Sequence, residues 1–319
     1  MGTRQVRPDA SPRTTLDKAA DENFPVAPFF LPRSWRDDLM AVYGYARLVD
    51  DIGDGDLASG GADAVHFGLD PAQAADRLVM LDAFEADLRR VFPDPAADAD
   101  GRVDGHPGEE STPHHPLLRA LASTVRRHSL TPEPFIGLIE ANRQDQLVSR
   151  YETYGDLVAY CALSADPVGR LVLAVTGSTS PERVRLSDSV CTALQIIEHL
   201  QDVAEDLAAD RIYLPAEDME RFRVTEADLA APTADAQVRA LVAFEADRAG
   251  RLLGDGLPLV GSVHGRLRLL LAGFVAGGRA AIAAIEAAGY DVLPGPPRPT
   301  RAGLMREVGV VLRRAGREG

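Results

Sequence analysis

Apolar side chains recur along most of the chain at the three- and four-residue spacing of an amphipathic helix. No segment alternates β-branched and polar residues between Asn-Gly turns, which is the pattern of a β-hairpin. The pattern therefore predicts an all-α fold. The expected helices cover residues 34–52, 71–92, 116–129, 132–151, 156–175, 181–206, 234–254, 262–288 and 301–315.

Three of these helices begin with a capping signal. Ser34 is followed three residues later by Asp37, a variant of the capping box. Thr131–Pro132 and Ser180–Pro181 each place a hydroxyl before a proline, a residue that suits the first helical position because no N–H is needed there. We expect all three hydroxyls to cap their helices.

Three segments lack helical periodicity. Residues 1–21 are polar and predict a disordered N-terminal segment. Residues 55–75 predict a loop, and residues 93–116 are low in complexity and predict a mobile insertion. The expected organisation is a single helical domain over 22–293 and a basic tail helix over 294–319.

Composition and charge narrow the class of protein. The 319 residues, 45% of them apolar, suffice for a sizeable core. The net charge of −14 argues against nucleic acid as the main partner, because phosphate binding needs a basic surface. Two isolated cysteines make no disulfide framework, and the N-terminus has no apolar core of a signal peptide. The most apolar run, Leu269–Gly278, is about half a membrane span, so we expect a cytoplasmic protein.

A polar stripe runs along the first helix. At 100° per residue, Tyr43, Arg47, Asp50 and Asp54 fall within about 60° of one another. The rest of the circumference is apolar, which is typical of a buried helix. Because carboxylates are rarely buried without a partner, the stripe is expected to face an internal cavity or cleft.

A second acidic stripe spans Gln195 to Asp206. Glu198, Asp202, Glu205 and Asp206 fall within about 100° of one another, with no Lys or Arg three or four residues away. Such a stripe is either a solvated helix face or a site whose repulsion a divalent cation relieves. Carboxylates four residues apart lie ~6 Å from each other, which suits Mg²⁺. The two stripes together favour the metal site, with a diphosphate as its natural ligand.

These stretches resemble the paired aspartate motifs of the squalene/phytoene synthase family. They read DDIGD (Asp50–Asp54) and DVAED (Asp202–Asp206), and RIYLP (Arg211–Pro215) follows in register. YETYGDLVAYC (Tyr151–Cys161) is similar to the central helix of that family. Softer segments are most similar to the hydroxysqualene synthases within it, namely ENFPVA (Glu22–Ala27), RQDQ (Arg143–Gln146), SADPVGRLVL (Ser164–Leu173) and GYDVL (Gly289–Leu293).

The resemblance implies an isoprenoid synthase fold around a central cavity, with the two motifs facing each other across its mouth. It implies Mg²⁺ as cofactor, held by Asp50, Asp54, Asp202 and Asp206, with Asp51 secondary. Glu198, where many relatives have Asn, is left open as an extra ligand, and Gln201 replaces an Arg of many relatives. The catalytic residues would be those four aspartates with Tyr43 and Arg47. The substrate-binding residues would be Phe24, Tyr43, Arg47, Gln195 and Tyr213.

The reaction implied is that of hydroxysqualene synthase: presqualene diphosphate and water give hydroxysqualene and diphosphate. One alternative is a head-to-head condensation of prenyl diphosphates by the same site. Another is a non-catalytic helical assembly protein of the same fold. An isoprenoid diphosphate is the expected substrate, and a presqualene diphosphate synthase is the expected functional partner. The basic tail either packs on its own domain or makes a peripheral contact with the inner face of the membrane.

Five further side chains are interpreted as follows. Tyr45 is either a core aromatic or, beside Tyr43, a stabiliser of a carbocation. Arg143 is interpreted as a local ion pair with Asp145. His199 is interpreted as a helix-surface residue, with a role as a base as the alternative. The pair His114–His115 is interpreted as linker rather than as a metal cluster.

Overall fold

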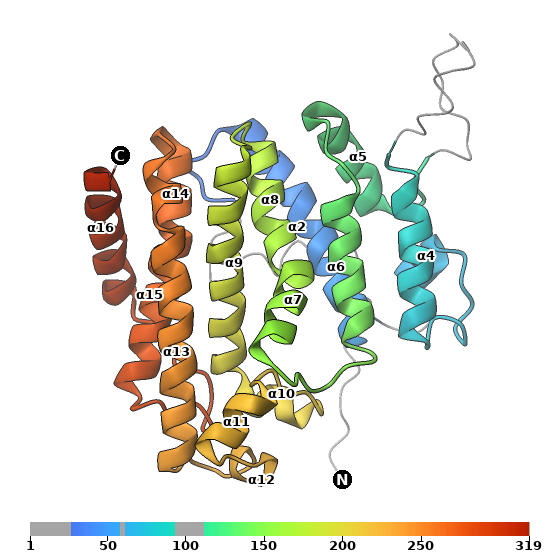
Figure 1. Cartoon of the computed structure of the whole chain (residues 1–319). Helices are drawn as coiled ribbons and strands as arrows, with labels where there is room; N and C mark the ends of the chain where they lie inside the picture. The colour runs from blue at the N-terminus through green and yellow to red at the C-terminus, as the bar shows by residue number, and fades with distance from the viewer. Residues whose placement is uncertain (1–26, 58–60, 93–111, 319) are drawn as a thin grey trace. The chain divides into compact units, whose positions relative to one another are not determined.

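The computed structural model of the chain describes residues 27–57, 61–92 and 112–318 (Figure 1). Within these ranges every regular element is a helix, and the β-contact is an isolated bridge between Arg150 and Ile212. The predicted all-α fold is therefore confirmed. The predicted N-terminal segment, most of the predicted insertion and Phe24 lie outside the described residues. The chain divides into two compact units, residues 1–146 and 147–319.

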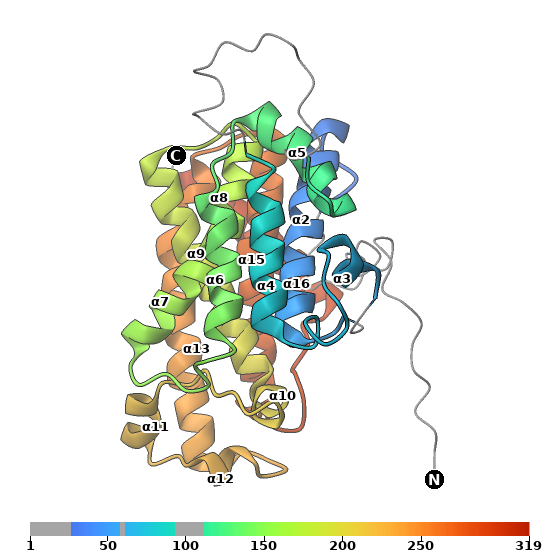
Figure 2. The same ribbon diagram turned by 90° about the vertical axis from the view of Figure 1, so that its right-hand side faces the viewer.

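The first unit is built around its longest helix, α2, which contacts α4, α5 and α6 (Figure 2). Its core includes Leu48, Phe84 and Phe135, all fully buried. These apolar side chains recur at helical spacing, so packing of α2 fixes where its polar stripe points. The helices of this unit are α2 (Arg33–Asp54), α3 (Ala62–His66), α4 (Arg77–Arg89), α5 (Pro116–His128) and α6 (Glu133–Gln144).

Two predicted helix caps in this unit are wrong. α2 begins one residue before Ser34, with Pro32 at the N-cap position and no side-chain cap. α6 begins at Glu133 behind Pro132, again without a side-chain cap, and ends at Gln144 rather than near 151. In each case a proline with its fixed φ starts the helix, and no hydroxyl caps it.

The end of the predicted insertion is packed, which corrects the linker interpretation of His115. This side chain is fully buried and caps α5, because its Nδ1 accepts the backbone N–H of Leu117. Its Nε2 lies 3.0 Å from Oδ1 of Asp63. The backbone N–H groups of His114 and His115 both donate to Asp87. The low-complexity composition concealed this buried cap.

The second unit is a bundle in which α9 contacts α7, α8, α13 and α15 (Figure 1). Its longer helices are α7 (Tyr154–Ser164), α8 (Asp166–Val175), α9 (Pro181–Gln201), α13 (Ala236–Gly256), α15 (Gly265–Ala287) and α16 (Arg301–Glu318). Short helices connect them: α10 (Val203–Ala208), α11 (Ala216–Phe222), α12 (Glu226–Leu229) and α14 (Pro258–Gly261). The predicted cap of α9 is confirmed, since the Ser180 hydroxyl accepts the N–H of Arg183.

Two segments of this unit, Tyr154–Val175 and Gly265–Ala287, are long and apolar enough to cross a membrane. The second contains the run that the sequence predicted to be too short. About half of each apolar window is buried within the protein, at 50% and 56%, which is typical of core helices. The tail helix α16 packs on α15, with Nε of Arg279 3.1 Å from the Glu307 carboxylate. Packing on its own domain is therefore the observed role of the tail.

A buried carboxyl between α8 and α9 makes stability depend on pH. Asp166 is 5% exposed and accepts a hydrogen bond of 3.0 Å from the Thr192 hydroxyl. Burial, and then the charge of Asp188, raise its pKa from 3.8 to about 7. The folded state therefore binds more protons than the unfolded state between these values, so the stability from this group falls as the pH rises toward 7.

We expect Asp166→Asn to be more stable than the parent at pH 8 by about 2 kcal/mol, because the amide keeps the acceptor for Thr192 and has no charge to bury. The advantage should shrink as the pH is lowered toward 5. Urea unfolding at several pH values measures this difference. A difference that stays constant with pH would contradict the assignment.

Candidate active site

The C-terminal end of α2 carries the first carboxylate motif. Asp50 is partly buried and accepts a hydrogen bond of 3.2 Å from Nδ2 of Asn142 on α6. Burial, and then the charge of Asp54, raise the pKa of Asp50 to about 7, while Asn142 and Arg47 oppose the shift. Asp54, one turn later, is exposed. The pair therefore combines one desolvated carboxyl with one solvated carboxylate on the same helix face.

Asp51 and Arg47 form an ion pair within the same helix. Asp51 is 2% exposed, and its Oδ1 lies 3.0 Å from Nε of Arg47. A second carboxylate, that of Asp56, lies 3.9 Å from the same guanidinium. Tyr43, one turn before Arg47, is partly exposed. The stripe predicted from the helical wheel is thus present, and Asp51 adds a carboxylate that pairs with Arg47.

Two further side chains hold the first motif, Gln146 just after α6 and Arg77 at the start of α4. Nε2 of Gln146 donates 3.0 Å to the carbonyl of Gly53, and Nη1 of Arg77 donates to the same oxygen. A Cβ on Gly53 would lie 1.8 Å from Oδ1 of Asn142, so only glycine permits this approach. Both Asn142 and Gln146 lie in or beside the RQDQ segment, whose function no spacing rule revealed.

The structure decides two neighbouring interpretations. Tyr45 is fully buried, lies against the rings of Phe84 and Phe135, and donates its hydroxyl to the Phe135 carbonyl at 2.8 Å. It is a core residue, so it stabilises no carbocation. Arg143 forms ion pairs from α6 to three other carboxylates rather than to Asp145, namely Asp82, Glu85 and Glu140.

The second motif lies at a helix break that the sequence analysis missed. α9 ends at Gln201, and Asp202 has φ −105° and ψ 15° before α10 begins at Val203. The backbone hydrogen bond from the N–H of Asp206 to the carbonyl of Asp202 persists at 2.8 Å. Asp202 and Asp206 therefore stay one turn apart, although the continuous helix that the wheel assumed is interrupted between them.

The second motif concentrates negative charge. Burial, and then the charges of Glu198, Glu205 and Asp206, raise the pKa of Asp202 to about 6. Glu198 and Glu205 are exposed, and the side chain of Asp206 is 24% exposed. The carboxylates thus destabilise one another until a cation offsets them.

His199 lies among these residues and not on the open helix surface, which corrects its interpretation. Its side chain is 11% exposed, and its ring stacks on that of Tyr213 with 3.7 Å between centroids and 10° between planes. Nδ1 lies 3.8 Å from the Asp206 carboxylate, and Nε2 lies 3.3 Å from Nε2 of Gln195. The predicted residues Gln195, Asp206 and Tyr213 are therefore brought together around His199.

Tyr213 is placed by an extended segment that pairs with residues 149–152. The N–H of Ile212 donates to the Ser149 carbonyl at 2.9 Å, and the N–H of Ala216 donates to that of Tyr151 at 2.8 Å. Tyr213 then stacks on Tyr151 and tilts against Tyr160, at 5.6 and 5.5 Å between centroids. This aromatic cluster holds Tyr213 against His199.

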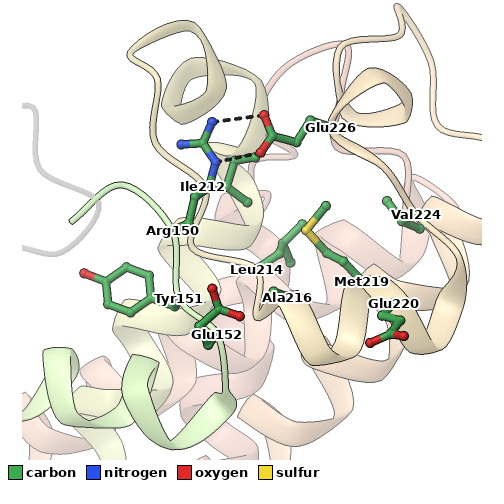
Figure 3. Close-up of a pocket in the computed structure, with 10 residues that line it drawn as sticks. All are labelled: Arg150, Tyr151, Glu152, Ile212, Leu214, Ala216, Met219, Glu220, Val224 and Glu226. Carbon is green, nitrogen blue, oxygen red and sulfur yellow. Dashed lines mark hydrogen bonds and ion pairs between the residues drawn. The ribbon is translucent and has the colours of Figure 1, made fainter.

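A cavity of about 380 Å³ is lined by residues from both of these paired segments (Figure 3). Its wall is largely apolar and includes Tyr151, Leu214 and Met219. At its rim the guanidinium of Arg150 donates two hydrogen bonds, of 2.8 and 3.0 Å, to the Glu226 carboxylate. Of the predicted site residues that the structure describes, none lines this cavity.

Comparison with known proteins decides the family. The squalene/phytoene synthase family matches residues 17–304, which is most of the chain. The chain belongs to this family of isoprenoid synthases. Within the squalene/phytoene synthases, it is 34% identical over 248 residues to a hydroxysqualene synthase of Zymomonas mobilis, covering 76% of this chain and 71% of that protein.

The chain is also similar to two further members of the family. It is 30% identical over 240 residues to a 15-cis-phytoene synthase of Synechococcus elongatus, covering 72% of this chain and 68% of that protein. The crystal structure of squalene synthase HpnC from Alicyclobacillus acidocaldarius matches with a TM-score of 0.70 at 41% identity, covering 89% of this chain and 93% of that one. The all-α isoprenoid synthase fold is thereby confirmed. That the two motifs face one another stays a prediction.

Gln201, which the sequence analysis singled out as a departure from the family pattern, has a hydrogen-bond partner. Its side-chain amide donates to the carbonyl of Pro297, in the segment before α16. Gln201 thus holds the segment of chain that leads to the tail. Glu198, the other departure, is exposed, and its role as a metal ligand stays a prediction.

The donor set of this family member fits Mg²⁺. Among residues 27–57, 61–92 and 112–318, no three His, Cys, Asp or Glu side chains are placed to hold a metal ion by themselves. Mg²⁺ needs no such cage, because it keeps several waters and takes one or two carboxylates together with phosphate oxygens. Asp50 with Asp54, and Asp202 with Asp206, supply carboxylates of this kind.

Proposed function

We propose that the chain is a hydroxysqualene synthase, which converts presqualene diphosphate and water into hydroxysqualene and diphosphate with Mg²⁺ as cofactor. The observation that carries the proposal is the second motif, where burial and then three neighbouring acids raise the pKa of Asp202. Such a cluster of carboxylates is better explained as a binding site for a cation and its anionic ligand than as a solvated helix face. The similarity to the Zymomonas hydroxysqualene synthase and to HpnC supports the choice of reaction.

The reaction assigns a task to each part of the chain. Bound Mg²⁺ would neutralise the departing diphosphate, and Asp50, Asp54, Asp202 and Asp206 would hold it. Arg47, with its partner Asp51, would add positive charge near the phosphates.

The bond between carbon and the diphosphate oxygen breaks, and the cyclopropylcarbinyl cation rearranges. The oxygen of a water molecule then bonds to carbon, while its proton passes to the released diphosphate. Tyr43 would face the cation, and Gln195 and Tyr213 would contact the substrate.

A condensing enzyme is the second candidate, because the chain is nearly as similar to a phytoene synthase. Such an enzyme would join two prenyl diphosphates at the same carboxylates. The third candidate is a non-catalytic assembly protein of the same fold. We also propose a cytoplasmic location, near an enzyme that supplies presqualene diphosphate.

The full-length protein with Mg²⁺, offered presqualene, farnesyl or geranylgeranyl diphosphate in turn, distinguishes these candidates. We expect hydroxysqualene from presqualene diphosphate alone, carrying one ¹⁸O atom when the water is labelled, as measured by mass spectrometry. Turnover of farnesyl or geranylgeranyl diphosphate without that product would favour the condensing enzyme. No turnover, together with no rise in melting temperature on adding Mg²⁺ and inorganic diphosphate, would favour the assembly protein.

A further inference from the structure

His199 makes contacts that a packing residue does not need. Its ring lies parallel to that of Tyr213. Its two nitrogens lie near two different residues, Asp206 of the second motif and Gln195 of α9. Nδ1 lies 3.8 Å from the Asp206 carboxylate, and Nε2 lies 3.3 Å from the amide nitrogen of Gln195. Both are among the residues assigned above to the metal and the substrate. His199 thus joins a ligand and a substrate-binding residue through one rigid ring.

The polarity of these contacts fixes the tautomer. The side-chain nitrogen of Gln195 can only donate, so Nε2 of His199 must accept, and the ring proton lies on Nδ1. Nδ1–H then faces the acceptor-only carboxylate of Asp206. In this tautomer Nε2 accepts from Gln195 at 3.3 Å, and Nδ1–H lies 3.8 Å from the Asp206 carboxylate.

The ring has little freedom to leave this position. Tyr213 is 7% exposed and is itself backed by Tyr151 and Tyr160, which are 3% and 4% exposed. On the helix side, His199 follows Ile196 and Ile197, both 2% exposed, in the last turns of α9. A small crevice lined by His199, Asp206, Arg211 and Tyr213 holds about 10 Å³, close to the minimum that one water needs.

We propose that His199 is a positioning residue of the second motif: it orients Asp206 through Nδ1–H and Gln195 through Nε2, and Tyr213 holds its ring in place. The proposal rests on the proposed function, since Asp206 and Gln195 matter only if the motif binds a metal diphosphate. Residues that orient ligands from behind change metal affinity about 10–100-fold when they are removed.

The test uses the full chain with His199→Phe, His199→Asn and, as a matched control, His264→Phe. Phenylalanine keeps the stacked ring and removes both nitrogens, whereas asparagine removes the ring and keeps an N–H near the place of Nδ1. His264 is an exposed histidine of the same unit, whose side chain makes no capping bond. Titration calorimetry measures Mg²⁺ affinity in the presence of inorganic diphosphate, and melting temperature without ligand measures the fold.

We expect His199→Phe to melt near the parent temperature and to bind Mg²⁺ about 10–100-fold more weakly. His199→Asn should recover part of that affinity although it loses the stack, and His264→Phe should match the parent. Parent-like affinity in His199→Phe would overturn the proposal. So would a loss in His199→Asn as large as in His199→Phe, because the nitrogen would then be irrelevant. Should His199→Phe fail to fold, the affinity of His199→Asn decides alone.

A different result would identify a failure of the proposed function. If the parent protein itself shows no Mg²⁺-dependent binding of diphosphate, the second motif is not a metal site, and the role of His199 falls with it. If the parent binds and the variants bind equally well, the function stands and only His199 is misassigned.

Discussion

Replacing Asp202 with Asn is expected to lower kcat on presqualene diphosphate about 10³-fold or more while leaving the fold intact. Asn keeps the size of Asp but loses the negative charge that strengthens the binding of Mg²⁺ to an oxygen ligand. Three neighbouring acids, Glu198, Glu205 and Asp206, currently oppose the charge of Asp202. Removing one of four repelling charges should make the fold as stable as the parent or more stable, a pattern typical of residues kept for function.

The matched control for this variant is Asp255→Asn, which changes an exposed aspartate on α13 in the same unit. It should retain parental kcat. Steady-state kinetics and thermal unfolding of both variants measure the two effects separately. Parental turnover in Asp202→Asn would show that the second motif is not the site, and a large drop in melting temperature would show that its role is structural.

Replacing Arg248 with Met is expected to destabilise the protein by about 3–5 kcal/mol. Nη1 of Arg248 donates 2.8 Å to Asp218 and 3.1 Å to Glu245, two carboxyls that are 4% and 1% exposed. Its guanidinium also lies over the ring of Tyr154, 4.0 Å from the centroid. Methionine fills much of the space but leaves both buried carboxyls without their cation, and burial already raises the pKa of Glu245.

The control is Arg251→Met, close by on the same helix. Among the residues that the structure describes, the ion pair of Arg251 is with Asp247. Both side chains are exposed, at 60% and 66%, so its loss should be worth less than about 1 kcal/mol. Urea unfolding of the two variants gives the comparison. Equal losses would contradict the view that burial, rather than the presence of an ion pair, sets the effect.

The parts of this fold that the sequence predicted are those with local causes. Helical periodicity is set by neighbours three and four residues away, so the helices were found along most of the chain. The Ser180 cap was found because its partner is three residues on. The predicted cap at Ser34 was wrong, because Pro32 with its fixed φ already starts the helix there. The continuous helix predicted through Asp202 was also wrong, since a helical wheel assumes a straight helix and shows no break.

The sequence predicted only those parts of the site whose geometry is set by residues close together in the chain. The aspartate stripes are sequence-local, whereas their supports come from distant residues. Asn142 donates to Asp50 from another helix, and the residue pattern of neither helix predicts that hydrogen bond. Likewise, the stack of His199 depends on Tyr213, which is placed by pairing with residues 149–152. A single sequence contains these residues but does not show that they meet.

The tight approach at Gly53 limits how the first motif can diversify. A methyl group at this position would collide with Asn142, which itself donates to Asp50. A substitution at Gly53 is therefore tolerated only together with a smaller residue at 142, and that second change removes the hydrogen bond to Asp50. The two positions are therefore coupled in one direction: a change at 53 depends on a change at 142, whereas a smaller residue at 142 meets no clash and loses the hydrogen bond to Asp50.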